Sequence, residues 1–255
     1  MLVELFYAVT RAFPSAWWVI ASLGYIAFAL IFSKVFPVVI IPLFYKYKNI
    51  QDEALRRAIL DLARRAAVKV TDAFEINMSK NTKKANAALV GWGDTRRIIL
   101  ADNLINEFSP EEVSAVVAHE IGHYKLRHIW KLILSGAAST FAGFYIFSLL
   151  AGRMIQFFRA DGVSDFYMFP SVGLAFMLFN MVALPAHNAY SRFLERQADI
   201  FALRLTGSKS GFISVMEKLA EKNLSDTNPG RIIEFLFYDH PPISRRIESA
   251  RVFEG

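Results

Sequence analysis

Three long stretches without a charged side chain restrict the fold of this chain more than any other feature. They cover residues 16–32, 132–152 and 166–190. A helix needs about 20 apolar residues, at ~1.5 Å each, to cross the hydrocarbon core of a bilayer. The sequence therefore predicts a multi-pass membrane protein. The residues before the first stretch are themselves apolar, which favours a retained anchor over a cleaved signal peptide.

The first stretch resumes its apolar character over residues 35–45. Pro37 and Pro42 are expected to bend or end this extension near the membrane interface. We therefore predict an N-terminal membrane anchor over residues 1–45 and a membrane-embedded domain over residues 46–255. The spans within the second domain are expected at about residues 130–152 and 166–188.

The distribution of basic residues predicts the orientation in the membrane. Lys and Arg number 29 against 23 Asp and Glu, a net charge of +6. The basic residues are dense over residues 46–127, whereas the loop at 152–165 holds only Arg153 and Arg159. The positive-inside rule then places residues 46–128 and the tail after 190 on the cytoplasmic side. No basic run is interleaved with aromatics, so no nucleic-acid partner is expected.

The polar segment between the first two apolar stretches predicts a small sheet beside helices. Residues 51–70 have the periodicity of an amphipathic helix. Short strands are expected at residues 74–78, 87–90 and 97–100, the last two joined by a glycine-rich turn. The predicted fold class is mainly α, with multi-pass membrane helices and a small β-sheet.

A helix start is encoded at Ser109, with Pro110 at the first helical position and Glu112 completing a capping box. The helix is expected to run from Pro110 into the second apolar stretch. It carries the sequence His119-Glu120-Ile121-Gly122-His123, which has the HExxH pattern.

Two histidines four residues apart lie on one face of a helix, so both imidazoles can bind a single zinc ion. Glu120 would then stand beside the water that such an ion activates. His119 and His123 could instead be polar residues near a helix end, but two histidines and a glutamate next to lipid are costly without a partner. The absence of cysteine excludes thiolate ligands and disulfides.

A catalytic zinc site needs a third protein ligand. The segment after the third apolar stretch offers Glu195 and Asp199, four residues apart in a segment that looks helical. Glu195 could complete a two-His, one-Glu site, and Asp199 could accept a hydrogen bond from a ligating histidine. The alternative is that this acidic pair, next to arginines, is a solvated helix face.

Five stretches together resemble the Ste24-type CAAX prenyl proteases, which are zinc metallopeptidases of family M48 related to the HtpX membrane proteases. These stretches begin at Asn86 (NAALVG), Arg97 (RIILADNLI), His119 (HEIGHYKLRH), Glu195 (ERQAD) and Asp239 (DHPPISRRI). They occur in the family's order, and the first two together with His128 are more similar to Ste24 than to HtpX.

The resemblance implies a membrane zinc metalloendopeptidase with a zincin-like catalytic helix and one zinc ion per chain. The implied residue roles are as follows: zinc ligands His119, His123 and Glu195; general base Glu120; support behind the ligands Asp199 and His128; contact with substrate backbone Asn86, Ala87 and Ala88; and stabilisation of substrate or oxyanion His240 and Arg246. Whether His128 supports a ligand or lies at the membrane interface stays open.

The implied partners are the lipid bilayer and a peptide or protein substrate, including membrane-anchored or prenylated ones. An HtpX-like protease that degrades damaged membrane proteins is the alternative within the class. A protein of another class, an inactive scaffold with structural zinc, would need a fourth protein ligand, and His128 is the only candidate. The resemblance covers the later half of full-length Ste24 proteins, so a short relative and a partial chain both stay open.

Overall fold

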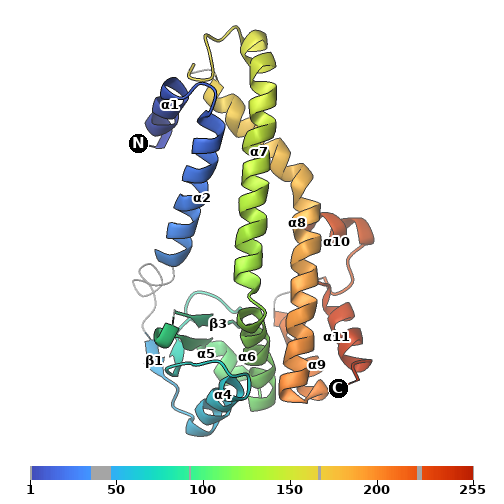
Figure 1. Ribbon diagram of the computed structural model, residues 1–255. Helices are drawn as coiled ribbons and strands as arrows, with labels where there is room; N and C mark the ends of the chain where they lie inside the picture. The colour runs from blue at the N-terminus through green and yellow to red at the C-terminus, as the bar shows by residue number, and fades with distance from the viewer. Residues whose placement is uncertain (1, 36–46, 92, 166–167, 223–225, 255) are drawn as a thin grey trace. The chain divides into compact units, whose positions relative to one another are not determined.

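The computed structural model describes residues 2–35, 47–91, 93–165, 168–222 and 226–254 (Figure 1). The fold is mainly α-helical with one small sheet, as predicted. Contacts divide the chain into a first unit, residues 1–34 with 130–187, and a second unit, residues 35–129 with 188–255. The predicted extension with Pro37 and Pro42 lies outside the described residues after Val35. The predicted domain boundary at residue 45 stays a prediction.

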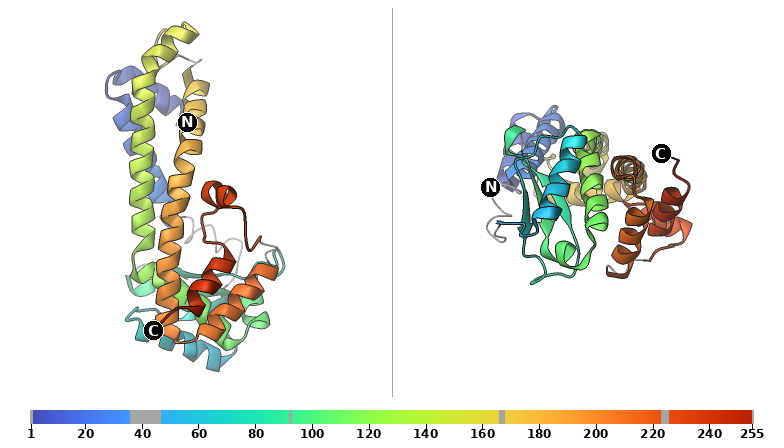
Figure 2. Two further views of the ribbon diagram at one scale, coloured as in Figure 1. Left: turned by 90° about the vertical axis from the view of Figure 1, so that its right-hand side faces the viewer. Right: turned by 90° about the horizontal axis from the view of Figure 1, so that it is seen from below.

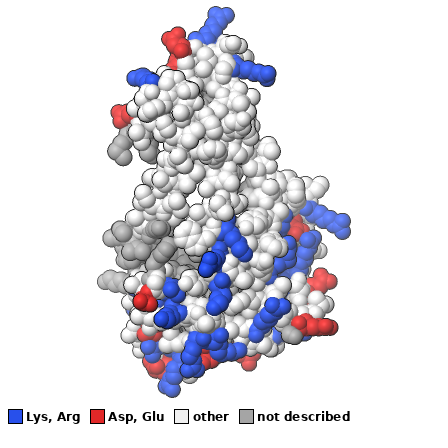
Figure 3. All heavy atoms as spheres, in the orientation of Figure 1, with Lys and Arg blue, Asp and Glu red and all other residues white. Residues whose placement is uncertain are grey.

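The first unit consists of one short helix, α1, and three longer apolar ones. They are α1 (Leu2–Ala12), α2 (Trp17–Val35) and most of α7 (His128–Phe158) and α8 (Met168–Thr206). Helices α7 and α8 are each long and apolar enough to cross a membrane, whereas the apolar part of α2, Trp17–Ser33, is shorter. On the face drawn in Figure 3, charged side chains gather mainly over the second unit. The first unit thus presents the apolar surface that a bilayer requires.

The interior of the first unit is aromatic. The Trp17 ring meets Phe147 edge to face, with ring centroids 5.6 Å apart, and both side chains are buried. Outward-facing side chains on α7 and α8 are also apolar, for example Leu134, Leu149 and Val182, which is 81% exposed. A helix that is apolar all round is stable beside lipid.

A four-stranded mixed sheet lies in the second unit. Its strands are β1 (Tyr47–Asn49), β2 (Ala73–Ile76), β3 (Ala87–Val90) and β4 (Arg97–Ala101), in the order β1-β2-β4-β3. Strands β2 and β4 are parallel, and the other pairs are antiparallel. The three predicted strands are confirmed, with the first displaced towards its N-terminus, and β1 was not predicted. Among the described strands β3 lies at the edge of the sheet, where one side of its backbone is not paired with another of these strands.

The second unit also holds six whole α-helices among the described residues. They are α4 (Glu53–Arg65), α5 (Asp102–Glu107), α6 (Pro110–Lys125), α9 (Lys209–Lys222), α10 (Arg231–Phe237) and α11 (Ile243–Arg251). Of these, α4, α5 and α6 contact this sheet. Helix α6 contacts α4, β3 and α9, and α9 in turn contacts α11 (Figure 2). Val113, Val117 and Ile121 on α6 are fully buried. The central helix of the unit is therefore the one that carries the HExxH pattern.

The start of α6 is confirmed, but its predicted continuation into the apolar stretch is wrong. Ser109 and Glu112 form the capping box, with Pro110 at the first position. The helix ends at Lys125, and α7 begins at His128. Arg127 has φ +56°, in the left-handed region that ends right-handed helices. The helix is interrupted there, and the His128 side chain is buried within the second unit.

Glu112 supports a stability prediction, because its side chain is only 3% exposed and still charged. Its carboxylate accepts hydrogen bonds from Ser214 Oγ (2.5 Å), Lys218 Nζ (2.7 Å) and the Ser109 backbone N–H (2.7 Å). Replacing Glu112 by Gln is expected to lower the free energy of unfolding by about 2 kcal/mol, since Lys218 loses its counter-charge. Thermal unfolding in detergent measures the loss, and Glu111→Gln, an exposed neighbour, is the control.

The same carboxylate predicts a pH dependence. Burial acts to raise the pKa of Glu112, but the hydrogen bonds from Lys218 and Ser214 outweigh burial and hold the pKa below its usual value. The stabilisation is therefore complete above the unfolded-state pKa of about 4.3 and is lost as the pH falls through the lower folded-state pKa. The free energies of unfolding of the wild type and of Glu112→Gln should show their full difference at pH 7. The two values should converge in strong acid. An equal difference in the free energy of unfolding at pH 7 and in strong acid would contradict a charged pair of Glu112 with Lys218.

Candidate metal centre

Three side chains from two helices converge in the second unit. His119 and His123 lie one turn apart on α6, and their Nε2 atoms are 3.0 Å apart. Glu195 on α8 places Oε2 at 3.3 Å from His119 Nε2 and Oε1 at 3.2 Å from His123 Nε2. The three ligand atoms all lie within 4.8 Å of one another. The structure thus brings together the three residues that the sequence suggested as zinc ligands.

This geometry fits a zinc ion. Donors about 2.0–2.1 Å from a tetrahedral ion lie ~3.3–3.4 Å from one another, close to the distances among these three residues. The buried Glu195 Oε2 accepts no hydrogen bond from the described residues. Burial acts to lower the pKa of His119, but its contacts with Asp199 and Glu195 outweigh burial and raise the pKa to about 9. The cluster therefore favours positive charge at the point where the ligand atoms meet.

Asp199 lies behind His119, on the side away from the cluster. Its Oδ1 is 2.9 Å from His119 Nδ1, which leaves Nε2 available to a metal. Arg246 on α11 donates to the same carboxylate, from Nε to Oδ2 (2.9 Å) and from Nη2 to Oδ1 (2.6 Å). Arg246 thus reaches the centre through Asp199, and its expected contact with substrate stays a prediction.

A second chain of contacts lies behind His123. Its Nδ1 is 3.0 Å from His128 Nδ1, and His128 Nε2 is 3.2 Å from the side-chain oxygen of Gln197. If His123 donates from Nδ1 to His128, then His128 donates from Nε2 to Gln197. His123 Nε2 then carries no proton and its lone pair can bind a metal. Gln197 was not predicted from the sequence, although it lies between Glu195 and Asp199 in the ERQAD stretch.

Gly122 explains how α8 approaches α6 closely enough. A Cβ atom at this position would lie 3.2 Å from a ring carbon of Phe201 and 3.3 Å from backbone atoms of Ala198. Such contacts are tighter than ordinary packing distances, so glycine permits the close crossing that places Glu195 beside the histidines. The signal in the sequence was a glycine in a helix interior, which costs about 1 kcal/mol relative to alanine and calls for a packing reason.

Glu120 and His240 lie around the three ligands. Burial raises the pKa of Glu120, although the nearby His119 and His123 act to lower it. A carboxyl group with a raised pKa is suited to proton transfer near neutral pH. His240 is 54% exposed, with Nε2 3.6 Å from Glu195 Oε2 and Nδ1 2.9 Å from Asp239 Oδ1. It therefore stands at the solvent-accessible rim of the centre.

The predicted substrate-contacting residues lie at the start of β3. Asn86 is exposed and precedes the strand, and its carbonyl accepts a hydrogen bond from the Ala101 N–H (2.9 Å). Ala87 and Ala88 are the first two residues of the strand. Strand β3 packs against α6, the helix with the two histidines. A role in binding substrate stays a prediction for these three residues.

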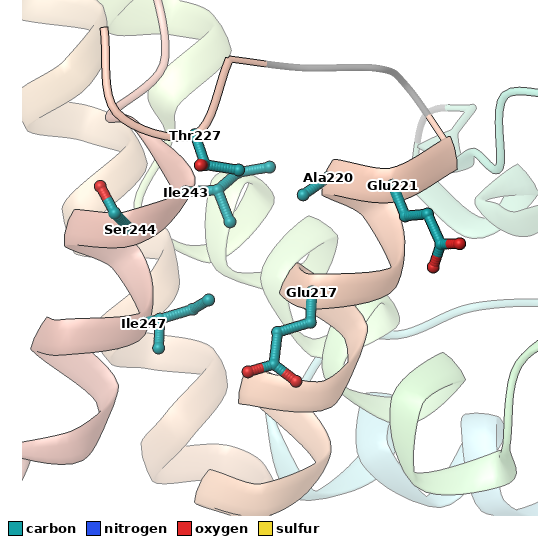
Figure 4. A pocket seen from close by; sticks show the side chains of 7 residues that line it. All are labelled: Glu217, Ala220, Glu221, Thr227, Ile243, Ser244 and Ile247. Atoms are coloured by element: carbon teal, nitrogen blue, oxygen red, sulfur yellow. The ribbon is translucent and has the colours of Figure 1, made fainter.

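A cavity of about 590 Å³ between α9 and α11 is separate from this centre (Figure 4). Ile243 and Ile247 of α11 line one side of it, and Glu217, Ala220 and Glu221 of α9 line the other. None of its lining residues belongs to the predicted site. The cavity therefore shares no residue with the His119–His123–Glu195 cluster.

The HExxH helix and the distant carboxylate define the class of zincin-like metallopeptidases. Comparison with known families agrees. The chain belongs to Peptidase family M48, whose sequence profile matches residues 49–254.

Individual relatives are similar over most of this chain. "Uncharacterized metalloprotease YhfN" of Bacillus subtilis (strain 168) is 29% identical over 100% of this chain and 61% of its own length. "CAAX prenyl protease 1" of Saccharomyces cerevisiae is 30% identical over 96% of this chain and 58% of its own. The crystal structure of S. mikatae Ste24p has a TM-score of 0.83 at 28% identity, over 97% of this chain and 61% of that one. The chain thus spans about three fifths of the length of these relatives.

Proposed function

We propose that the protein is an integral-membrane, zinc-dependent endopeptidase with one zinc ion per chain. The observation that carries this proposal is the convergence of His119, His123 and Glu195 at zinc-ligand spacing. Glu120, next to His119 on the same helix, supplies a carboxylate that is not part of the ligand cluster. Three protein ligands with a free position are typical of catalytic rather than structural zinc sites.

The residues around the ligands divide the chemistry of peptide hydrolysis among them. A bound zinc ion supplies a Lewis acid that polarises the peptide carbonyl and acidifies water. Glu120 accepts the proton of the attacking water and passes it to the leaving amine. His240, at the rim, donates to the oxyanion that develops on the substrate. Asp199 and His128 hold the two ligating imidazoles in the tautomers that keep Nε2 free.

The edge of β3 is the proposed place where substrate binds. An extended peptide could add to this edge through backbone hydrogen bonds, starting at Asn86 and continuing past Ala87 and Ala88. Backbone pairing selects for an extended conformation more than for a side-chain sequence. The relatives named CAAX prenyl proteases favour a prenylated C-terminal tail as one substrate.

Substrate profiling of the purified, reconstituted protein tests this function. Zinc-dependent cleavage of a farnesylated peptide, three residues from its C-terminus, supports the CAAX-type activity. Cleavage of many unfolded membrane-protein loops, with no preference for prenylated peptides, supports an HtpX-like role instead. No cleavage of either substrate by the zinc-loaded protein would contradict an endopeptidase.

An inactive scaffold with structural zinc is less well supported. The sequence offered His128 as its fourth ligand, but the Nδ1 atom of His128 faces the Nδ1 of His123, on the side of that ring away from the ligand cluster. The Nε2 atom of His128 faces Gln197. Within the part of the chain that the structure describes, the cluster of possible ligands holds three residues and not four.

We further propose that the centre lies on the cytoplasmic side of the membrane. The segments that carry His119 and Glu195 meet in one unit, so both must lie on the same side of the bilayer. The excess of basic residues in the 46–127 segment favours the cytoplasmic side. Because the chain has no cysteine, a single cysteine at exposed Lys209 would report the side through its access to impermeant maleimide.

His128 supports a prediction about metal affinity. Replacing His128 by Phe removes the acceptor for His123 Nδ1, so zinc affinity is expected to fall about 10- to 100-fold. His128→Asn retains an acceptor oxygen and should restore part of the affinity. Competition with a chelator measures both variants, and the Co²⁺ absorption spectrum reports ligand geometry independently of activity. Unchanged affinity in His128→Phe would assign His128 to packing alone.

A further inference from the structure

Helix α10 (Arg231–Phe237) has its polarity reversed compared with a surface helix in water. Its apolar side chains face outward: Ile232 is 75% exposed, and Ile233, Phe235 and Phe237 are also exposed. Its acidic residue, Glu234, is only 7% exposed. A helix on an aqueous surface shows the opposite pattern, with apolar residues inside and charges outside.

Polar contacts fix the helix in this orientation. Arg192 of α8 donates from Nη1 to the carbonyl oxygens of Glu234 (3.0 Å) and Tyr238, and Asn188 donates to that of Leu236 (2.8 Å). The Glu234 carbonyl also accepts the backbone N–H of Tyr238 (3.2 Å), so Arg192 and Asn188 add side-chain donors at the C-terminal end of α10, where carbonyl groups run out of partners within a helix. The helix is therefore attached to α8 by hydrogen bonds, while its apolar face is left free.

A second contact holds Glu234 on the inner side. Arg245 of α11 donates to Glu234 Oε1 (2.9 Å) and lies 2.8 Å from Oε2. Rotating α10 to bury its apolar residues would break the pair of Arg245 with Glu234. It would also separate Arg192 from the carbonyl groups to which it donates. The outward apolar face is thus a fixed feature of the second unit.

The attachment point lies where α8 leaves its apolar stretch. Asn188 and Arg192 follow directly after residues 168–187, the part of α8 assigned to the first unit. Within that stretch Met181 and Val182 are strongly exposed, as expected for lipid contact. A helix bound to the first polar turns after a span is at the depth of the membrane interface.

The charge around α10 points to the same partner. A cleft of about 390 Å³ is lined by Arg192, Arg231, Glu234, Phe235 and Arg245. Three guanidinium groups against one carboxylate give it a net positive charge, which complements the phosphates of lipid head groups. Exposed apolar residues next to a basic cleft are the combination found in helices that lie in the membrane interface.

We propose that α10 is an interfacial membrane helix that inserts its exposed isoleucine and phenylalanine side chains among the acyl chains of the bilayer. The arginines of the cleft lie at the level of the phosphates. His240 follows α10 after a short turn, so the bilayer sets the position of the segment that carries this residue at the rim of the metal centre. The proposal adds a membrane contact to those of the apolar helices and does not depend on peptidase activity.

Fluorescence quenching in vesicles tests the proposal. Because the sequence has no cysteine, a single introduced cysteine is the only site that a thiol-reactive dye labels. Ile232→Cys and Phe235→Cys are labelled with bimane and reconstituted into phosphatidylcholine–phosphatidylglycerol vesicles. Phospholipids with a nitroxide on the acyl chain are expected to quench both labels several-fold more than aqueous iodide does. Val252→Cys, a 73% exposed apolar position at the end of α11, is the matched control and should respond mainly to iodide.

The outcomes separate the bilayer from other partners. Labels on α10 that respond to iodide and not to the lipid nitroxide would overturn the proposal. So would labels that neither quencher reaches, since another protein surface would then cover the helix.

A charge variant gives an independent readout. Ile232→Asp, combined with the label at position 235, is expected to reduce lipid quenching at least twofold, because a carboxylate is expelled from the acyl region. Val252→Asp with the same label should leave it unchanged. Zinc content, measured in parallel, reports whether the variant is folded. Full lipid quenching in a folded Ile232→Asp protein would overturn the proposal.

Discussion

Replacing Glu120 by Gln is expected to reduce peptide cleavage about 10³-fold or more while the zinc content stays at one ion per chain. The glutamine has nearly the same shape but cannot accept a proton from water. Glu120 is not one of the three residues whose ligand atoms converge, so its replacement should not affect metal binding. Single-turnover cleavage of a fluorogenic peptide, together with zinc analysis of the same sample, measures both quantities.

The control for this variant is Glu111→Gln, an exposed substitution near the start of the same helix. It should retain full activity and full zinc. Substantial activity in Glu120→Gln would show that another group accepts the proton. Loss of zinc in that variant would show instead that Glu120 is a ligand.

Replacing Glu195 by Ala is expected to have the opposite signature, with loss of metal first and of activity as a consequence. Without this carboxylate the two imidazoles alone face the ion, and we expect zinc affinity to fall at least 100-fold. Chelator competition measures the affinity, and circular dichroism shows whether the helices persist.

Glu217→Ala is the matched control, because this exposed glutamate lines the cavity between α9 and α11 and not the metal centre. It should bind zinc as the wild type does. Wild-type affinity in Glu195→Ala would mean that a different residue completes the ligand set.

The local features of the site were predictable because they depend on neighbours in the sequence. The capping box at Ser109 fixes where α6 begins, and a spacing of four residues places His119 and His123 on one face. The lengths of the apolar stretches predicted α7 and α8 for the same reason. Such patterns require no knowledge of tertiary contacts.

The features that were not predicted from the sequence depend mainly on tertiary contacts. The break at Arg127 is not encoded by a glycine or proline, and it accompanies burial of the His128 side chain. Gln197 became recognisable as a partner of His128 only when α7 and α8 were placed together. Strand β1 has three residues, too few for an alternating pattern to be detected.

Helix α10 shows that the pattern of apolar residues does not predict which face of a helix is exposed. No element was predicted for its sequence, RIIEFLF, and the structure exposes four of its apolar residues while it buries Glu234. The hydropathy of a segment therefore does not distinguish a protein interior from a lipid surface. The contacts of Asn188 and Arg192 with its carbonyl groups, and of Arg245 with Glu234, show which way the helix faces.

The X-ray absorption spectrum of purified protein at the zinc edge tests the metal centre most directly. We expect one zinc per chain, bound by two imidazole nitrogens and a carboxylate oxygen from the protein, with a remaining position filled by a light solvent atom. The imidazole contribution should fall by half in a variant that lacks His123. A zinc shell closed by a third imidazole, or a zinc-free protein that still cleaves peptides, would contradict the proposed site.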